Sequence, residues 1–322
     1  GSLQGLPGLR LIQSLWAGVE RLLADATLPA GVPIARMVDP AMSAAMAETA
    51  LWATLALHRG FFAYARAQRE GRWAPHAQRR ADEVPVLLLG CGQMGRACAQ
   101  ALAAQGYPVT AWRRSAAIDD AVVLPGVTVI HGDAALRAAL GRTQVLVNLL
   151  PLTAGTRGLL DAALFARLPR GAGVVNLARG AHVVDADLLA ALDSGQLGHA
   201  VLDVFHQEPL PAAHRFWTHP AVTLLPHAAA MTDPRSAAAV AAANMAALAA
   251  GRVPFLVGGA YAFARYTGIE RHTKDFDIFV LPEDAERVLG VLAGAGCVKD
   301  MTFPHWLGKA FCGEDFSWDN PK

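Results

Sequence analysis

The sequence predicts an α/β protein built on a doubly wound parallel sheet. The first observation is a series of short, continuous apolar runs at residues 84–89, 107–112, 173–175, 200–202 and 222–225. Runs of this length without alternation are typical of strands buried on both faces of a parallel sheet. The second observation is a helical stretch between the first two runs, as in a strand–helix–strand unit. The chain has 322 residues, which is enough for two domains.

A glycine-rich loop joins the first predicted strand to the helix of about residues 96–105. It reads Gly90-Cys91-Gly92-Gln93-Met94-Gly95. Gly90 permits a tight turn, Gly92 lets the backbone approach a pyrophosphate, and Gly95 lets the helix pack closely on the strand. The helix N-terminus offers free N–H groups to phosphate. Glycines also mark ordinary turns, but the strand before this loop and the helix after it favour dinucleotide binding.

The residues after the second predicted strand indicate which dinucleotide binds. An NAD site places Asp or Glu about 20 residues past the glycine loop, whereas this chain has Trp112-Arg113-Arg114-Ser115 there. Guanidinium groups bind phosphate bidentately and keep their charge, so these residues suit a 2′-phosphate. A solvated basic pair on a surface loop is the alternative interpretation. The position of the pair favours NADP(H) over NAD(H).

A cation, a carboxylate and an imidazole follow the last three apolar runs. Arg179 lies in N-L-A-R-G, Glu208 in H-Q-E-P-L and His227 in L-P-H-A. Ligands of open α/β sheets bind at the carboxyl ends of the strands. There the three side chains could bind an acid, polarise its carbonyl and move a proton. Each taken alone could be a capping, solvated or hydrogen-bonded loop residue, but together they predict a catalytic trio.

Residues 84–229 resemble the D-2-hydroxyacid dehydrogenase family, most closely its glyoxylate/hydroxypyruvate reductase branch. The matching strings, in the family's order, are G-C-G-Q-M-G, A-W-R-R-S, N-L-L-P-L-T, L-P-R-G-A-G-V-V-N-L-A-R-G, D-L-L-A-A-L-D-S-G-Q-L, L-D-V-F-H-Q-E-P-L-P and L-P-H-A-A-A-M-T. The resemblance implies a Rossmann domain at 84–230 and an oxidoreductase that reduces a small 2-keto acid to the D-2-hydroxy acid.

The resemblance also implies roles for single residues. Arg179 would hold the substrate carboxylate and carbonyl, His227 would be the acid/base, and Glu208 would hydrogen-bond its imidazole. Asp203 would face the nicotinamide carboxamide. The full cofactor-binding set would be Gly90, Gly92, Gln93, Met94, Gly95, Arg113, Arg114, Ser115, Leu150, Pro151 and Asp203.

Residues 1–39 match the family's substrate domain only in part. They hold a strand-like run at 9–14, a short helix at 19–24 and a second strand at 32–37. The family has about two more strand–helix units at this point. We therefore expect a partial, flavodoxin-like substrate domain that is truncated at its N-terminus. The string S-L-W-A-G-V-E resembles the family's substrate-binding loop, which implies substrate contacts by Trp16, Ala17, Gly18 and Val19.

Helical segments flank the predicted dinucleotide-binding domain. Residues 40–83 would link the domains and form a homodimer, and residues 231–254 would return to the substrate domain. The aromatic residues of the first segment are expected in the core and the dimer interface rather than at a cofactor, and they are Trp52, His58, Phe61, Phe62 and Tyr64.

The last segment, 255–322, departs from the dehydrogenase pattern. Gly258-Gly259 after an apolar run, followed by Asp275-x-Asp277, resembles the nucleotidyltransferase superfamily of the DNA polymerase β type up to about residue 316. Carboxylates at Asp275 and Asp277 would share one face of a strand and could hold Mg²⁺. The alternative is a surface D-x-D. Since the family's third carboxylate is not recognisable, we expect a small α/β fragment without transferase activity.

Composition excludes several classes of function. The chain has 28 basic and 27 acidic residues, a net charge of +1, which argues against nucleic acid or anionic membranes as partners. The alanine-rich run at 237–250 is too short to span a bilayer, and the chain start lacks the features of a signal peptide. The four cysteines and 11 histidines show no metal-ligand spacing. We expect a cytoplasmic protein with no metal in its dehydrogenase part.

Three hypotheses remain at this point. The intact trio favours an NADPH-dependent reductase of glyoxylate, hydroxypyruvate or a similar 2-keto acid. The missing N-terminal units favour a non-catalytic dinucleotide-binding hybrid. The D-x-D string alone supports nucleotidyl transfer.

Overall fold

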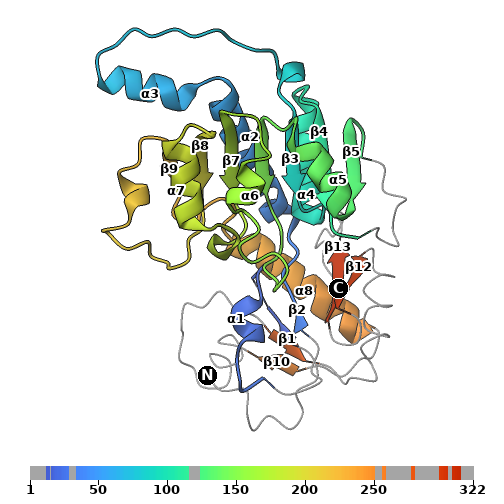
Figure 1. Cartoon of the computed structure of the whole chain (residues 1–322). Coiled ribbons are helices and arrows are strands. Elements are labelled where there is room, and N and C mark those ends of the chain that lie inside the picture. The colour runs from blue at the N-terminus through green and yellow to red at the C-terminus, as the bar shows by residue number, and fades with distance from the viewer. Residues whose placement is uncertain are drawn as a thin grey trace. The chain divides into compact units, whose positions relative to one another are not determined.

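The computed structural model describes residues 12–14, 16–28, 34–115, 124–250, 256–258, 277–279, 297–303 and 307–312. It divides into two compact units, each described by itself below. The first unit comprises residues 1–42 and 232–322, and the second comprises residues 43–231 (Figure 1). No helix within the described ranges is long and apolar enough to cross a membrane. The predicted domain boundaries and the predicted cytoplasmic location stay predictions.

The second unit contains a sheet of seven parallel strands. Their order is β5-β4-β3-β6-β7-β8-β9, so the chain reverses direction along the sheet between β3 and β6. This order confirms the predicted doubly wound α/β fold. The strands are β3 (Val86–Leu89), β4 (Val109–Arg113), β5 (Val127–His131), β6 (Val145–Asn148), β7 (Ala172–Asn176), β8 (Leu197–Leu202) and β9 (Val222–Leu224).

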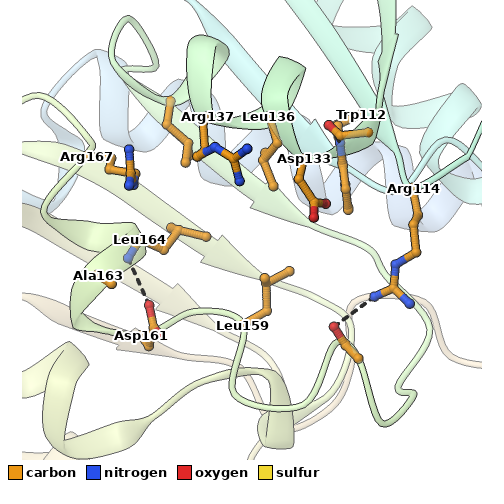
Figure 2. A pocket seen from close by; sticks show the side chains of 13 residues that line it. Trp112, Arg114, Asp133, Leu136, Arg137, Leu159, Asp161, Ala163, Leu164 and Arg167 are labelled. Carbon is orange, nitrogen blue, oxygen red and sulfur yellow. Dashed lines mark hydrogen bonds between the residues drawn. The ribbon is translucent and has the colours of Figure 1, made fainter.

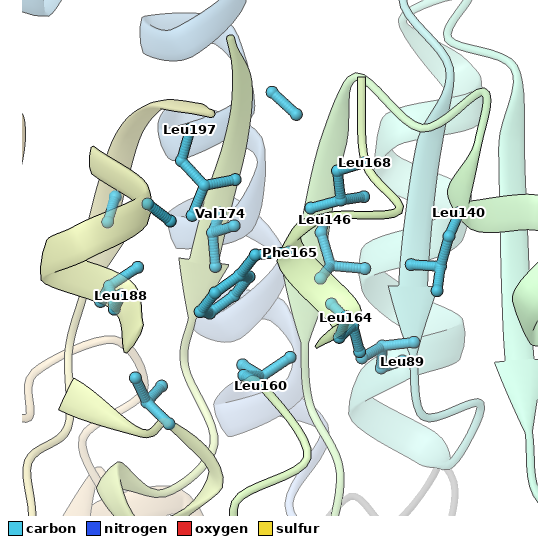
Figure 3. Packing of buried hydrophobic residues seen from close by; sticks show 14 of the residues in the cluster. Leu89, Leu140, Leu146, Leu160, Leu164, Phe165, Leu168, Val174, Leu188 and Leu197 are labelled. Carbon is cyan, nitrogen blue, oxygen red and sulfur yellow. The ribbon is translucent and has the colours of Figure 1, made fainter. Parts of the chain in front are cut away.

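Helices cover both faces of this sheet (Figure 1). Because successive side chains of a strand point to opposite faces, Val86 and Leu88 pack with α2 and α4, whereas Leu87 and Leu89 pack with α5, α6 and α7. Figure 3 shows the second of these layers, with Phe165 at its centre. The helices are α2 (Pro40–His58), α3 (Phe61–Arg69), η1 (Ala81–Glu83), α4 (Gln93–Ala104), α5 (Gly132–Leu140), α6 (Ala162–Phe165), η2 (Gly180–His182), α7 (Asp185–Asp193) and η3 (Arg215–Trp217).

Three element boundaries differ from the expected ones. The first strand begins at Val86 rather than at residue 84, because Pro85 has no N–H to donate to the sheet. The helix after the glycine loop begins at Gln93 rather than at residue 96, so the end of the glycine motif forms its first turn. The helical segment at 40–69 is two helices, since Gly60 adopts a φ of 71° that ends the first one.

The first unit contains short strands and one long helix. β1 (Ile12–Gln13) pairs in parallel with β2 (Ile34–Ala35), and α1 (Glu20–Leu23) lies between them in sequence. Within the described residues, each of these three elements is shorter than the sequence predicts. The long helix, α8 (Pro234–Ala250), begins with an Asp-Pro pair, as α2 does. Asp39 and Asp233 cap these helices, and Ser236 Oγ donates to Asp39 Oδ2 at 2.6 Å.

Two further strand pairs are described near the C-terminus. β10 (Leu256–Gly258) pairs antiparallel with β11 (Asp277–Phe279), and β12 (Cys297–Phe303) pairs antiparallel with β13 (Leu307–Cys312). Gly258 is the register partner of Asp277. Asp275 and Gly259, which the predicted nucleotidyltransferase motif also needs, lie outside the described residues.

One half-buried histidine makes the stability of the second unit dependent on pH. His199 of β8 stacks on Phe62 with ring centroids 4.3 Å apart, and its Nε2 bonds to Thr223 Oγ1 at 2.9 Å. Burial, with a smaller effect from Arg66, lowers the pKa of His199 to about 4. The unfolded imidazole takes its proton near pH 6.5. The unfolded state therefore binds more protons between these values, and stability is lost as the pH falls from 6.5 to 4.

We predict that His199→Phe, which keeps the stacked ring, weakens this pH dependence. Urea unfolding of the wild type between pH 7 and pH 4 should show about 3 kcal/mol more loss of unfolding free energy than the variant shows. His131→Phe, at an exposed position of β5, is the control and should keep the wild-type dependence. Parallel curves for wild type and His199→Phe would contradict the prediction.

Candidate active site

The glycine loop has the geometry that a dinucleotide pyrophosphate needs. Gly90 has a φ of 106°, and a Cβ there would lie 3.0 Å from the carbonyl of Leu149. A Cβ at Gly95 would lie 2.0 Å from the Gly90 oxygen, so α4 can approach β3 only with glycine there. At Gly92, which precedes the first turn of α4, a Cβ would meet no protein atom within 4 Å. The turn, the close packing and the open approach to the helix N-terminus all fit a nicotinamide dinucleotide.

Gln93 and Met94 lie in the first turn of α4 and are half-buried. The basic residues follow the neighbouring strand: Arg113 ends β4, and Arg114 and Ser115 are exposed beyond it. Arg114 Nη2 donates to the carbonyl of Gly155 at 2.8 Å (Figure 2). The structure thus places the three predicted phosphate ligands together at the carboxyl end of β4.

A cavity of about 730 Å³ opens beside Arg114. Trp112 and the first turns of α5 line it on one side, and residues 155–167 line it on the other (Figure 2). Its charged lining consists of Arg114, Asp133, Arg137, Asp161 and Arg167. The sequence had singled out none of these except Arg114. The cavity therefore lies next to the carboxyl end of β4. Its walls are partly apolar, and its charged residues give a small excess of positive charge.

Two buried asparagines at neighbouring strand ends are functional candidates that the sequence reasoning missed. Asn148 ends β6, Asn176 ends β7, and Asn148 Nδ2 donates to Asn176 Oδ1 at 2.9 Å. Asn148 Oδ1 then accepts from the N–H of Leu150 at 3.3 Å, and Asn176 Nδ2 donates to the carbonyl of Arg179 at 3.0 Å. The pair therefore fixes the loops that carry two predicted site residues. The available signal was an Asn directly after each apolar run.

The structure brings His227 and Glu208 into contact. His227 Nδ1 lies 2.6 Å from Glu208 Oε2, and the side chains are 51% and 34% exposed. The other oxygen of Glu208 accepts from the N–H of Phe205 at 2.8 Å, which orients the carboxylate. His227 has a φ of 53°, a left-handed conformation that costs about 1–3 kcal/mol in a residue other than glycine. The surrounding structure must therefore hold it in place.

Asp203, at the end of β8, holds the backbone around His227. Its buried carboxylate accepts from the N–H of Ala228 at 2.7 Å and from that of Ala229 at 3.1 Å, and its carbonyl accepts from the N–H of His227 at 2.9 Å. Burial raises the pKa of Asp203, and the two N–H donors oppose that rise. The predicted contact of Asp203 with the nicotinamide stays a prediction.

The remaining predicted site residues lie on loops. Arg179 is half-buried just after β7, and its Nη1 donates to the carbonyl of Ala178 at 2.6 Å. Leu150 and Pro151 follow β6, and the carbonyl of Pro151 accepts from Thr156 Oγ1 at 2.8 Å. All of these belong to the second unit.

The predicted substrate loop belongs to the first unit. Trp16 is exposed and Val19 is buried, with Ala17 and Gly18 between them. The loop is tied to the segment after β2, since Met37 N donates to the carbonyl of Trp16 at 3.1 Å. The carbonyl of Ala17 also accepts from an arginine of that segment at 3.2 Å. Among the described residues, no group of three or more His, Cys, Asp or Glu side chains could hold a metal ion.

This sheet, glycine loop and histidine–carboxylate pair define the class of nicotinamide-dependent dehydrogenases with a dinucleotide-binding domain. The family model of the D-isomer specific 2-hydroxyacid dehydrogenase NAD-binding domain matches residues 51–229. The glyoxylate/hydroxypyruvate reductase A of Serratia proteamaculans is 44% identical over 229 residues, which cover 70% of this chain and 72% of the relative. The same-named protein of Yersinia enterocolitica is 41% identical over the same shares.

Solved structures give the same assignment. A D-isomer specific 2-hydroxyacid dehydrogenase from Xanthobacter autotrophicus, in complex with NADPH and MES, superposes with a TM-score of 0.71 at 42% identity and 76% coverage of each chain. An NADPH-dependent glyoxylate/hydroxypyruvate reductase from Sinorhizobium meliloti, in complex with NADP and sulfate, has a TM-score of 0.71 at 39% identity, covering 77% of this chain and 78% of that one.

The chain belongs to the D-isomer specific 2-hydroxyacid dehydrogenase family, and it is an oxidoreductase with a nicotinamide-cofactor domain. The predicted resemblance of residues 255–316 to nucleotidyltransferases finds no support in these comparisons, because the matched family model ends at residue 229.

Proposed function

We propose that this enzyme reduces a small 2-keto acid of the glyoxylate or hydroxypyruvate type to the D-2-hydroxy acid with NADPH. The observation that supports this most directly is the contact of 2.6 Å between His227 Nδ1 and Glu208 Oε2 at the carboxyl edge of a dinucleotide-binding sheet. The names of the relatives from Serratia and Sinorhizobium support the substrate class.

His227 would supply the proton that the reduced oxygen needs. An ionised carboxylate can only accept, so the contact with Glu208 places a proton on Nδ1 and leaves Nε2 for the substrate. In its protonated form the imidazole would carry the transferable proton on Nε2. The bond from Phe205 N to Glu208 keeps the carboxylate, and through it the imidazole ring, in one orientation.

Arg179 would bind the substrate carboxylate and stabilise the negative charge that develops on the keto oxygen. The bond from Asn176 Nδ2 to the Arg179 carbonyl fixes the backbone from which the guanidinium projects. When bound, the reduced nicotinamide supplies the hydride to the keto carbon. Arg113, Arg114 and Ser115 would hold the 2′-phosphate, and the cavity beside Arg114 would take the adenosine end.

The direct test is the loss of NADPH absorbance with glyoxylate and with hydroxypyruvate, using the full chain. Turnover of either keto acid supports the proposal. Binding of NADPH without turnover of any 2-keto acid would contradict it and would favour the non-catalytic hybrid instead.

We predict that His227→Ala lowers kcat by about 10²–10⁴, the usual contribution of general acid catalysis. Glu208→Gln should also lower kcat, since a side-chain amide can donate as well as accept and no longer fixes the tautomer and orientation of the imidazole. Arg179→Ala should mainly raise the KM for the keto acid and also lower kcat. Steady-state kinetics between pH 5 and pH 9 measures all three. Near-normal activity of His227→Ala would refute the assignment.

We predict that NADPH binds more tightly than NADH, because Arg113 and Arg114 stand where an acid would bind the NAD ribose. Fluorescence titration of both cofactors with the double variant Arg113→Ala, Arg114→Ala should show about tenfold or greater weakening for NADPH and little change for NADH. Arg142→Ala, an exposed arginine after α5, is the matched control. Equal affinity of the wild type for both cofactors would count against the prediction.

We propose that the enzyme is a homodimer through the aromatic side chains of α2, α3 and the strap at 71–80. Trp52, Phe61 and Trp73 are 41%, 53% and 96% exposed. The strap is held in place, since His58 Nε2 bonds to the carbonyl of Arg79 at 2.8 Å. Large aromatic groups displayed on an ordered surface are typical of protein interfaces.

Light scattering after size exclusion should give twice the chain mass of 33.9 kDa for the wild type. The double variant Phe61→Ser, Trp73→Ser should give a monomer. Trp217→Ser, at another exposed tryptophan, should stay dimeric. A monomeric wild type would contradict the dimer.

A further inference from the structure

We propose that Asp185 is a positioning residue that clamps both ends of the loop 206–214 and so keeps Glu208 against His227. The proposal rests on the proposed function for the meaning of that contact. Asp185 is the first residue of α7 and follows the loop that carries Arg179. One carboxylate would then tie together the two loops that hold the predicted carboxylate-binding and proton-transfer groups.

The clamp is visible as two contacts to one carboxylate. His206 Nε2 lies 3.5 Å from Asp185 Oδ1, and His214 Nε2 lies 3.5 Å from Asp185 Oδ2. His206 and His214 are the two ends of the loop, and Glu208 lies between them. The Asp185 side chain is half-buried, with 30% exposed, so water competes less for these contacts than for contacts on the open surface.

The other bonds of the two histidines indicate where each ring carries its hydrogen. His206 Nε2 also lies 2.8 Å from the carbonyl of Val183, and a carbonyl can only accept, so Nε2 carries a hydrogen. His214 Nδ1 accepts from the N–H of Phe216 at 3.3 Å. That bond leaves the ring hydrogen of the neutral His214 on Nε2, which faces Asp185 Oδ2. His214 therefore presents its N–H to the carboxylate, whereas His206 donates its Nε2–H to Val183 and contacts Asp185 Oδ1 at 3.5 Å.

Besides Asp185, the loop is held by the bond of His206 to the Val183 carbonyl and by Trp217 Nε1, which donates to the Pro211 carbonyl at 3.0 Å. The residue before the loop packs tightly, because a Cβ at Gly180 would lie 2.0 Å from the carbonyl carbon of Phe205. Glu208 Oε1 accepts from the N–H of Phe205 at 2.8 Å, and Glu208 Oε2 lies 2.6 Å from His227 Nδ1. If the contact of His206 or His214 with Asp185 were lost, the backbone of residues 206–214 would gain conformational freedom. Both contacts of Glu208 would then weaken together.

The same helix provides a matched control at its other end. Asp193, the last residue of α7, contacts His219 Nε2 at 3.1 Å and Arg215 Nη2 at 3.4 Å. It is also an aspartate bound to basic groups that follow in the chain. It lies toward the amino-end edge of the strands, because α7 runs antiparallel to them, and none of these contacts involves the loop 206–214.

The experiment compares Asp185→Asn with Asp193→Asn in the full chain, by keto-acid kinetics and by NMR amide exchange. Asp185→Asn should lower kcat about tenfold, as expected when a proton donor is misplaced, with the Kd for NADPH unchanged. It should speed exchange of the Phe205 amide about tenfold, because that amide is bonded to Glu208. The amides of His227 and Ala228, bonded to Asp203, should keep their wild-type rates. Asp193→Asn should match the wild type in kcat and in Phe205 exchange.

His206→Gln tests the clamp from the loop side and should repeat both effects in case Asp185→Asn folds poorly. Wild-type exchange at Phe205 in both Asp185→Asn and His206→Gln would overturn the proposal. Equal thermal destabilisation by the two aspartate variants, with kcat unchanged in both, would also overturn it, since Asp185 would then be structural only. If the wild type reduces no 2-keto acid, the proposed function fails, and exchange at Phe205 alone decides whether the clamp exists.

Discussion

The arrangement of the site depends on one buried carboxylate. Asp203 directly follows β8, and it accepts from the N–H groups of Ala228 and Ala229, which follow β9. These bonds connect the carboxyl ends of two neighbouring strands and hold His227 at its φ of 53°. Two bonds to a charged acceptor, each worth about 1.5–3 kcal/mol, can offset the cost of that backbone conformation. The contact between His227 and Glu208 follows from this fixed backbone.

A buried polar side chain also connects two strand ends elsewhere along the carboxyl edge of the sheet. Asn148 and Asn176 join the ends of β6 and β7 and fix the loops at Leu150 and Arg179. A parallel sheet buried on both faces leaves its last backbone groups without strand partners, and a buried side-chain amide or carboxylate satisfies them. The polar groups that look like site residues are thus of two kinds. Some face the ligands, and others hold the loops from which those side chains project.

The sequence was sufficient for the parallel sheet and for the glycine loop, and insufficient for the hydrogen bonds that join the loops. Apolar runs and the glycine motif predict the sheet, because burial on both faces and close backbone approach restrict residue types strongly. Asp185 gave no such signal, and the signal for Asn148, an Asn after an apolar run, is a weak one. Aspartate and asparagine are ordinary residues at strand ends and helix starts, and only the spatial neighbourhood distinguishes a tie from a solvated side chain. The interruption at Gly60 was missed because alanine-rich flanks hide one glycine in a helical pattern.

The ties explain how an exposed site can still be ordered. His227 is half exposed, so apolar burial contributes little to holding it. The loops instead rest on hydrogen bonds to groups at the strand ends, where low exposure strengthens each bond relative to the same bond in water. Such a site keeps its histidine accessible to substrate while its backbone is constrained. The site is also sensitive to substitution, because removal of one acceptor leaves several backbone N–H groups unsatisfied at once. Substitutions behind the site should therefore affect proton transfer without touching any ligand.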